Sequence, residues 1–253
     1  MIESQALSAI VEEVDSALRA AGTPERAAAE KQYLKSDLLF YGATLPVIHA
    51  TVKAAKRACR DLRRPDLCVI VEMLWHEPVH DRRMAAVEFL ESYVTLLEPA
   101  DLALIERFIR EARTWALVDP LAANVTGNLV QRFPHLETEL DRWSVDPDFW
   151  VRRSALLACL LPLRRTADPA VFARFTRYAD AMLEEREFFI RKAIAWVLRE
   201  TAKVSPQLVV AWLRPRAGRA SGVTVREAVR HLPPDEREAL MAAYRAGGST
   251  GPA

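Results

Sequence analysis

Apolar positions recur with a helical period along nearly the whole chain. Segments such as "ALSAIVEEVDSALRA", "LPVIHATVKAAKRACRDL" and "PADLALIERFIREARTWAL" place apolar residues at i, i+3 and i+4 spacing, and we find no convincing alternating strand. Prolines separate these segments at short intervals, at Pro46, Pro65, Pro99, Pro120, Pro147 and Pro206. The pattern predicts an all-α protein built from short helices with short connections.

One phrase recurs along the chain, as "HDRRMAAVEFL", "FWVRRSALLACL", "FFIRKAIAWVL" and "VTVREAVRHL". Arg83, Arg153, Lys192 and Glu227 fall in register, at intervals of 70, 39 and 35 residues. Helical-pair repeats are about 40 residues long. The spacing therefore predicts a HEAT-like solenoid (an α-α superhelix), with one degenerate copy, "TWALVDPLAANVTGNLV", in which Asp119 takes the same register position 34 residues before Arg153.

Solenoids bind extended partners on their concave surface, and basic residues aligned there could grip a phosphate backbone. The alternative is that each charge merely starts a helix that faces solvent. The net charge of +1 does not decide between them, because 35 basic and 34 acidic residues can be sorted onto different faces.

The length of 253 residues permits one large domain or two small ones. We expect a single helical-repeat domain over residues 1–245 and a disordered tail over residues 246–253. Three cysteines are too few and too irregularly spaced for a disulfide framework, and no uncharged apolar run of membrane-spanning length is present. The acidic, amphipathic start does not resemble a signal peptide, so we expect a cytoplasmic protein.

The segment "HEPVH", residues 76–80, matches the pattern of two zinc-binding histidines one helical turn apart. Pro78 lies between the two histidines and would break the helix that has to align them. We therefore expect a loop here and no metal site. The chain also lacks a nucleotide-binding glycine loop and a nucleophile elbow, so no cofactor is expected.

The stretch "RTWALVDPLAANVTGNLVQR" contains one charge between its flanking arginines, Asp119. A carboxylate in an apolar run is costly to desolvate unless it caps a helix, pairs with a cation or takes part in chemistry. Asp followed by Pro is a favoured helix start, which predicts Asp119 as N-cap with Pro120 at the first helical position. Capping and a chemical role are compatible.

Four fragments together resemble the HEAT-repeat alkylpurine DNA glycosylases of the AlkD type: "KSDLLFYGATLP", "TWALVD", "FWVRRSALL" and "FFIRKAIAWVLRETAK". Matching features run in order from about residue 28 to residue 231. That family builds its site from a Trp, an Asp four residues later, an Arg in the next repeat and a Trp in the repeat after that. These resemble Trp115, Asp119, Arg153 and Trp196, and Tyr33 resembles an aromatic residue used beside the DNA.

The resemblance implies a monofunctional DNA glycosylase that releases cationic N3- and N7-alkylated purines from duplex DNA, with the damaged base left stacked, acting as a monomer near the nucleoid. Asp119 would stabilise positive charge on the sugar and position water. Trp115 and Trp196 would form an aromatic cleft for a cation. A set of basic residues would hold the backbone: Arg153, Arg152, Arg191, Lys192 and Arg226.

Two positions depart from the family pattern. Members often carry another Trp just before the motif Trp and an Asp just after it, where this chain has Thr114 and Ala116. These changes could alter the breadth of substrates. The hypothesis from a different class is a HEAT-like scaffold that binds DNA or another partner without catalysis.

Overall fold

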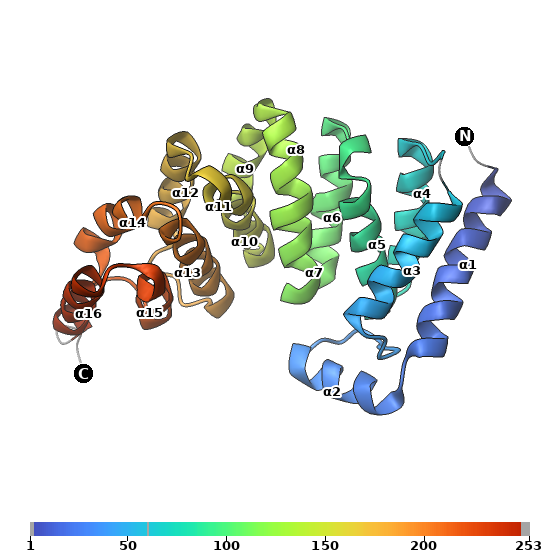
Figure 1. The fold of residues 1–253 in the computed structure, drawn as a ribbon, viewed down its shortest axis with the longest axis horizontal. Coiled ribbons are helices and arrows are strands. Elements are labelled where there is room, and N and C mark those ends of the chain that lie inside the picture. The colour runs from blue at the N-terminus through green and yellow to red at the C-terminus, as the bar shows by residue number, and fades with distance from the viewer. Residues whose placement is uncertain (1–2, 60, 249–253) are drawn as a thin grey trace. The chain divides into compact units, whose positions relative to one another are not determined.

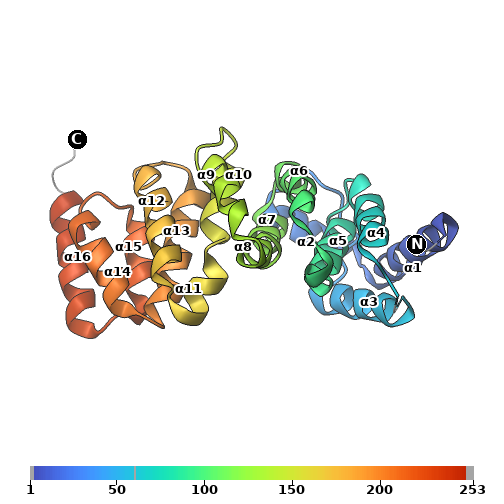
Figure 2. The same cartoon turned by 90° about the horizontal axis from the view of Figure 1, so that it is seen from above.

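The computed structural model describes residues 3–59 and 61–248, and its secondary structure is helical throughout except for turns and one bridge. That bridge pairs Leu39 with Val79 outside any strand of the described residues. The prediction of an all-α protein is confirmed. The chain divides into two compact units, which we call unit 1 (Met1–Leu121) and unit 2 (Ala122–Ala253) (Figures 1 and 2).

Unit 1 is a stack of helices around an apolar core. Its helices are α1 (Ser4–Ala21), α2 (Pro24–Leu34), α3 (Leu45–Ala58), α4 (Arg64–His76), α5 (His80–Ser92), α6 (Leu102–Ala112) and α7 (Trp115–Pro120). Helices α1, α3, α4 and α5 pack against one another and bury residues such as Leu18, Val52 and Leu74. Helix α2 differs, because Leu34 is its one buried residue, and it lies across the ends of α1 and α3 (Figure 1).

The segment that follows α2 is fastened to the start of α5. The buried Asp81 carboxylate accepts hydrogen bonds from the backbone amides of Tyr41 (2.9 Å) and Ala43 (2.8 Å). The phenol of Tyr41 donates to Asp15 on α1 (2.8 Å), which also forms an ion pair with Arg82 (2.9 Å). This network sets the position from which α2 projects.

Unit 2 continues the helical-pair pattern. Its helices are α8 (Gly127–Arg132), α9 (Glu137–Trp143), α10 (Phe149–Leu157), α11 (Leu160–Thr166), α12 (Pro169–Ala181), α13 (Phe188–Ala202), α14 (Pro206–Leu213), α15 (Gly222–Ala228) and α16 (Pro234–Gly248). Helix α13 packs against α10, which precedes it in the sequence, and against α15, which follows it. Its buried Ile190, Ile194 and Val197 supply the core between them.

The recurring sequence phrase corresponds to α5, α10, α13 and α15. In unit 1, Arg82 donates backwards to the carbonyl of Met73 (2.9 Å), and Arg83 donates forwards to the carbonyl of Glu111 (2.7 Å). Arg82 and Arg83 are adjacent in the sequence and form a basic doublet. The basic doublet on α10, Arg152 and Arg153, divides its contacts in the same way, one backwards and one forwards. Arg152 donates to the carbonyl of Asp146 just before its own helix (2.6 Å).

The second residue of the α10 doublet reaches the next repeat, since Arg153 donates to the carbonyl of Phe189 on α13. On α13, Arg191 likewise donates backwards to the carbonyl of Glu185 (2.7 Å), and Lys192 faces Glu227 of α15 at 3.9 Å. Each basic doublet therefore binds one repeat to the segment before it and to the repeat after it.

Two local predictions need correction. Asp119 is not an N-cap: α7 begins at Trp115 with Thr114 as its N-cap residue, and Pro120 lies inside the helical run. The run continues as a π-helical segment over Leu121–Thr126, whose wider turn changes the hydrogen-bond pattern directly after the proline. At the C-terminus, α16 extends through Gly248, so residues 246–248 are helical rather than disordered, and residues 249–253 lie outside the described residues.

The loop predicted for "HEPVH" is present. Helix α4 ends at His76 and α5 begins at His80, with Pro78 between them in extended connecting chain. The two histidines therefore belong to different helices.

Candidate functional site

Trp115 and Asp119 lie on the same short helix, α7, and each is half-buried. The helix starts after Thr114, whose extended backbone (φ −151°, ψ 139°) separates α7 from the end of α6. Leu117 and Val118 are fully buried and anchor α7 to α5 and α6. The i, i+4 spacing places the indole and the carboxylate on one face of α7, as the sequence predicts.

Tyr33 on α2 meets this face of unit 1. Its ring stands edge-on to the indole of Trp115, with ring centroids 6.0 Å apart and an interplanar angle of 83°. Tyr33 is 72% exposed, so the contact leaves most of its ring open to solvent. The contact brings together two of the aromatic residues selected from the sequence, in the edge-to-face arrangement that aromatic pairs favour.

The position of Tyr33 depends on residues that the sequence analysis missed. Asp81 holds the segment after α2, and the neighbouring His80 ring stacks on Phe40 with centroids 4.8 Å apart. Burial lowers the pKa of His80 to about 4, with the Asp81 charge acting in the opposite direction, so the ring is neutral at neutral pH. No local sequence signal marks Asp81, because its partners are backbone amides about forty residues away.

Arg153 and Trp196 lie in unit 2, on α10 and α13. Arg153 is only 4% exposed, and its guanidinium lies 5.9 Å from the centroid of the Phe189 ring while donating to the Phe189 carbonyl. Trp196 is half-buried, two turns further along α13. Asp119, Arg153 and Lys192 each stand four residues after the first residue of their helix, which matches the predicted register.

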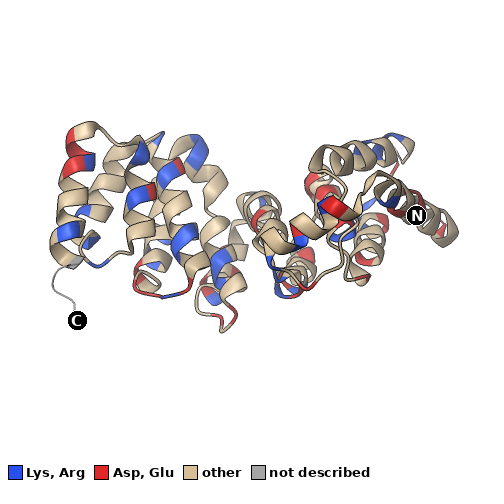
Figure 3. Ribbon diagram, turned by 90° about the horizontal axis from the view of Figure 1, so that it is seen from below, with Lys and Arg blue, Asp and Glu red and all other residues tan. Residues whose placement is uncertain are grey.

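The predicted DNA-binding cations of unit 2 differ in their contacts within the protein and in their exposure to solvent. Arg152 makes a forked contact with the Glu185 carboxylate, at 3.2 and 2.9 Å, in addition to its backbone contacts. Lys192 is 42% exposed, and Arg226 on α15 is exposed. Figure 3 shows basic positions on several neighbouring helices of unit 2, with acidic positions among them.

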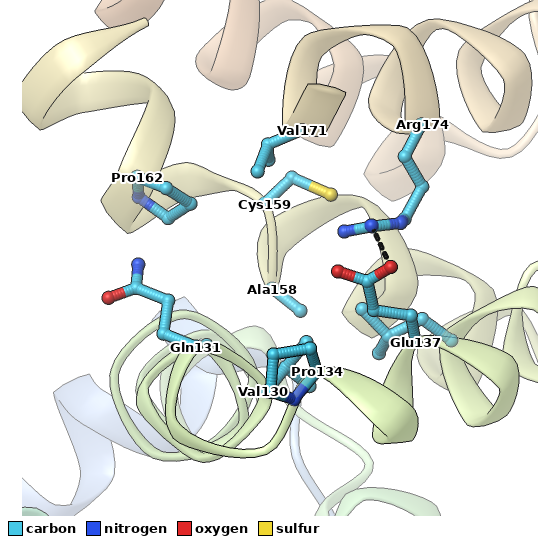
Figure 4. A pocket seen from close by; sticks show the side chains of 11 residues that line it. Val130, Gln131, Pro134, Glu137, Ala158, Cys159, Pro162, Val171 and Arg174 are labelled. Carbon is cyan, nitrogen blue, oxygen red and sulfur yellow. Dashed lines mark ion pairs between the residues drawn. The ribbon is translucent and has the colours of Figure 1, made fainter. Parts of the chain in front are cut away.

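A pocket of about 120 Å³ lies elsewhere in unit 2, lined by residues of α8, α9, α11 and α12 (Figure 4). Arg174 and Glu137 form an ion pair at its edge. Burial raises the pKa of the Cys159 thiol in its wall to about 12, so this cysteine is not a thiolate nucleophile. None of the site residues selected from the sequence lines this pocket.

Within residues 3–59 and 61–248, no group of three or more His, Cys, Asp or Glu side chains is arranged to hold a metal ion. Over the same ranges, none of the helices combines the length and apolar character needed to cross a bilayer.

The chain is similar in fold to a predicted DNA alkylation repair enzyme from Enterococcus faecalis, with 22% identity and a TM-score of 0.74, over 84% of this chain and 97% of that one. It is also similar to AlkD2 from Streptococcus mutans, with 13% identity and a TM-score of 0.59, over 82% of this chain and 98% of that one. No curated protein matches it. The model of one family, DNA alkylation repair enzyme, matches residues 14–232.

The two solved structures support the helical-repeat fold alone at these identities. The family match runs from α1 to the end of α15 and its following turn, and so includes every site residue named above. The chain belongs to the DNA alkylation repair enzyme family.

Proposed function

We propose that the protein is a monofunctional DNA glycosylase that hydrolyses the N-glycosidic bond of cationic N3- and N7-alkylated purines in duplex DNA, with the damaged base left stacked. The observation that carries the proposal is on α7, where the Asp119 carboxylate follows Trp115 by one turn and Tyr33 lies against that Trp. A carboxylate one helical turn from an aromatic pair suits a site that acts on positive charge.

The chemistry needs little help at the base. In an N3- or N7-alkylated purine the base is already cationic, so when the C1′–N bond breaks its electron pair neutralises the base. Positive charge then develops on the sugar as an oxocarbenium ion. A water molecule adds to C1′ and loses a proton. What the protein must supply is negative potential near C1′ and a positioned water, and Asp119 is the group we assign to both.

The aromatic and basic residues have complementary roles in this proposal. Trp115 and Trp196 present indole faces to the cationic nucleotide, each worth about 0.5–2 kcal/mol. Arg153 holds a backbone phosphate through its planar fork, which Lys cannot reproduce. The remaining backbone contacts are assigned to Arg152, Arg191, Lys192, Arg226 and Tyr33.

Release of free base tests the proposal. Duplex DNA with a single N7-methylguanine is incubated with the wild type and with Asp119→Asn, and free N7-methylguanine is quantified by chromatography. We expect release by the wild type, an abasic strand that stays intact without alkali, and release about 100- to 1,000-fold slower in the variant, the scale of removing one preorganised electrostatic group.

Glu12→Gln is the matched control, because it removes an exposed carboxylate of unit 1 from α1. It should release base at the wild-type rate. Absence of release by the wild type, with duplex DNA still bound, would favour the non-catalytic scaffold. Equal release by Asp119→Asn would refute only the role given to that carboxylate.

A further inference from the structure

Two basic residues next to the aromatic contact in unit 1 have an unusual backbone. Lys35 has φ 49° and ψ 44°, and Arg113 has φ 48° and ψ 20°, which is the left-handed region. Each is the C-cap residue of its helix, α2 and α6 respectively. Glycine is the usual residue there, since a Cβ makes this conformation unfavourable.

These two residues flank the aromatic contact in the sequence. Lys35 comes two residues after Tyr33, and Arg113 comes two residues before Trp115, and the rings of Tyr33 and Trp115 touch. Both side chains are exposed. Within the part of the chain that the structure describes, neither cation forms an ion pair.

The surroundings of Arg113 add to its positive field. Burial lowers the pKa of Arg83, the Glu111 charge opposes this, and the nearby Arg113 charge lowers it further. Arg113 therefore lies close enough to a second cation for the two to repel each other. An anion bound at Arg113 would relieve that repulsion.

The left-handed backbone occurs at two cations that form no ion pair among the described residues, next to the contact between the exposed Tyr33 and the half-buried Trp115. Strain of this kind concentrates where a side chain serves a ligand. The ligand that fits an exposed Lys and an exposed Arg beside an edge-to-face aromatic pair is a nucleic-acid backbone, since phosphates bind both cations.

We propose that Lys35 and Arg113 form a phosphate clamp, in which each binds a DNA phosphate beside the Tyr33–Trp115 contact and so sets the strand relative to α7. This inference rests on the proposed function, because it takes duplex DNA as the ligand. It adds two cations of unit 1 to a set of basic backbone contacts otherwise drawn from unit 2.

Glycine substitutions separate the charge from the backbone. Lys35→Gly and Arg113→Gly relieve the left-handed strain while removing the cation, so we expect the thermal midpoint to stay level or rise. Binding of an undamaged fluorescent duplex should weaken about 8-fold per variant at 0.1 M salt. The slope of log K against log salt should lose about 1 per variant, as for one lost phosphate contact.

The chain offers two matched controls. Ala167 is the third non-glycine residue with positive φ, at the C-cap of α11, and it is uncharged and buried. Ala167→Gly should leave DNA affinity unchanged. Lys53→Gln removes an exposed charge from α3 and should change affinity much less than either clamp variant.

The outcomes separate this inference from the proposed function. If the wild type releases N7-methylguanine but Lys35→Gly and Arg113→Gly bind DNA with wild-type affinity and salt slope, the clamp is overturned. An equal loss in Lys53→Gln would also overturn it, because the effect would then be one of overall charge. If the clamp variants lose affinity while the wild type releases no base, the clamp stands and the glycosylase proposal fails.

Discussion

The ring of Tyr33 stands edge-on to the indole of Trp115, 6.0 Å between centroids, although 82 residues separate them in the sequence. The contact joins α2, whose one buried residue is Leu34, to the helix that carries Asp119. The Trp115 ring on α7 therefore contacts α2, a helix whose residues are mostly exposed.

Removing this ring should affect activity more than stability. We expect Tyr33→Ala to slow release of N7-methylguanine by several-fold, since Trp115 loses its edge contact, while the free energy of unfolding changes by less than about 1.5 kcal/mol. Tyr33→Phe keeps the ring and should retain most of the rate. Single-turnover release and thermal unfolding measure both effects, and equal rates for the Ala and Phe variants would contradict this assignment.

Arg153 has a structural partner as well as an assigned ligand. Arg153→Ala leaves the Phe189 carbonyl without this donor, so we expect it to lower the free energy of unfolding by about 1–3 kcal/mol and to slow base release. Arg153→Lys can restore one hydrogen bond but not a fork. It should therefore recover stability in urea unfolding without recovering the rate; a rate that follows stability across both variants would argue against phosphate binding.

Acid should weaken the fold through His80. Its folded pKa of about 4 lies below the unfolded value of 6.5, so between these values only the unfolded chain takes up the proton. The free energy of unfolding should fall as pH drops from about 6.5 towards about 4, by about 2 kcal/mol at pH 5 from this group.

His80→Phe is the comparison for that prediction, because it keeps a flat ring against Phe40 without a titrating nitrogen. Urea unfolding at pH 7.5 and at pH 5 should show the difference in stability between wild type and variant shifting by about 2 kcal/mol in favour of the variant at the lower pH. A constant difference at the two pH values would mean that His80 does not titrate in this way.

Gly42 allows the segment after α2 to pack closely against the start of α2. Its φ of 84° is left-handed, and a Cβ there would stand 2.5 Å from the carbonyl oxygen of Thr23 and 2.7 Å from the amide of Ala27. We expect Gly42→Ala to destabilise unit 1 by about 1–3 kcal/mol and to slow base release by displacing α2.

Gly222→Ala is its control. The three atoms nearest to a Cβ at Gly222 belong to the ends of the Tyr244 and Arg226 side chains, which can move. Thermal unfolding should show little loss for this variant. Comparable losses for Gly42→Ala and Gly222→Ala would show that backbone crowding at Gly42 is not the cause.

The sequence predicted the helical class and the register well because both depend on periodic patterns. Trp115 and Asp119 share a helix as their spacing required, and Arg153 and Lys192 occupy equivalent positions on α10 and α13. These features follow from positions close together in the chain or from repetition.

Predictions of where individual helices start were less reliable. The Asp-Pro pair at residues 119–120 is a strong N-cap signal, but Thr114 starts the helix earlier and a π-helical segment follows the proline. Long-range polar contacts had no sequence signal at all. Nothing near Asp81 indicates that its carboxylate holds backbone amides of the segment after α2.

The basic doublets have a consequence at the C-terminal end of unit 2. On α5 and α10 the second residue of the doublet reaches forwards, but the register position on α15 is Glu227, which pairs back to Arg199 of α13 at 2.7 Å. Lys192 of α13 also faces this carboxylate, at 3.9 Å. The polar link between α13 and α15 therefore runs from two cations to one carboxylate, and a single neutral substitution at Glu227 would remove both contacts.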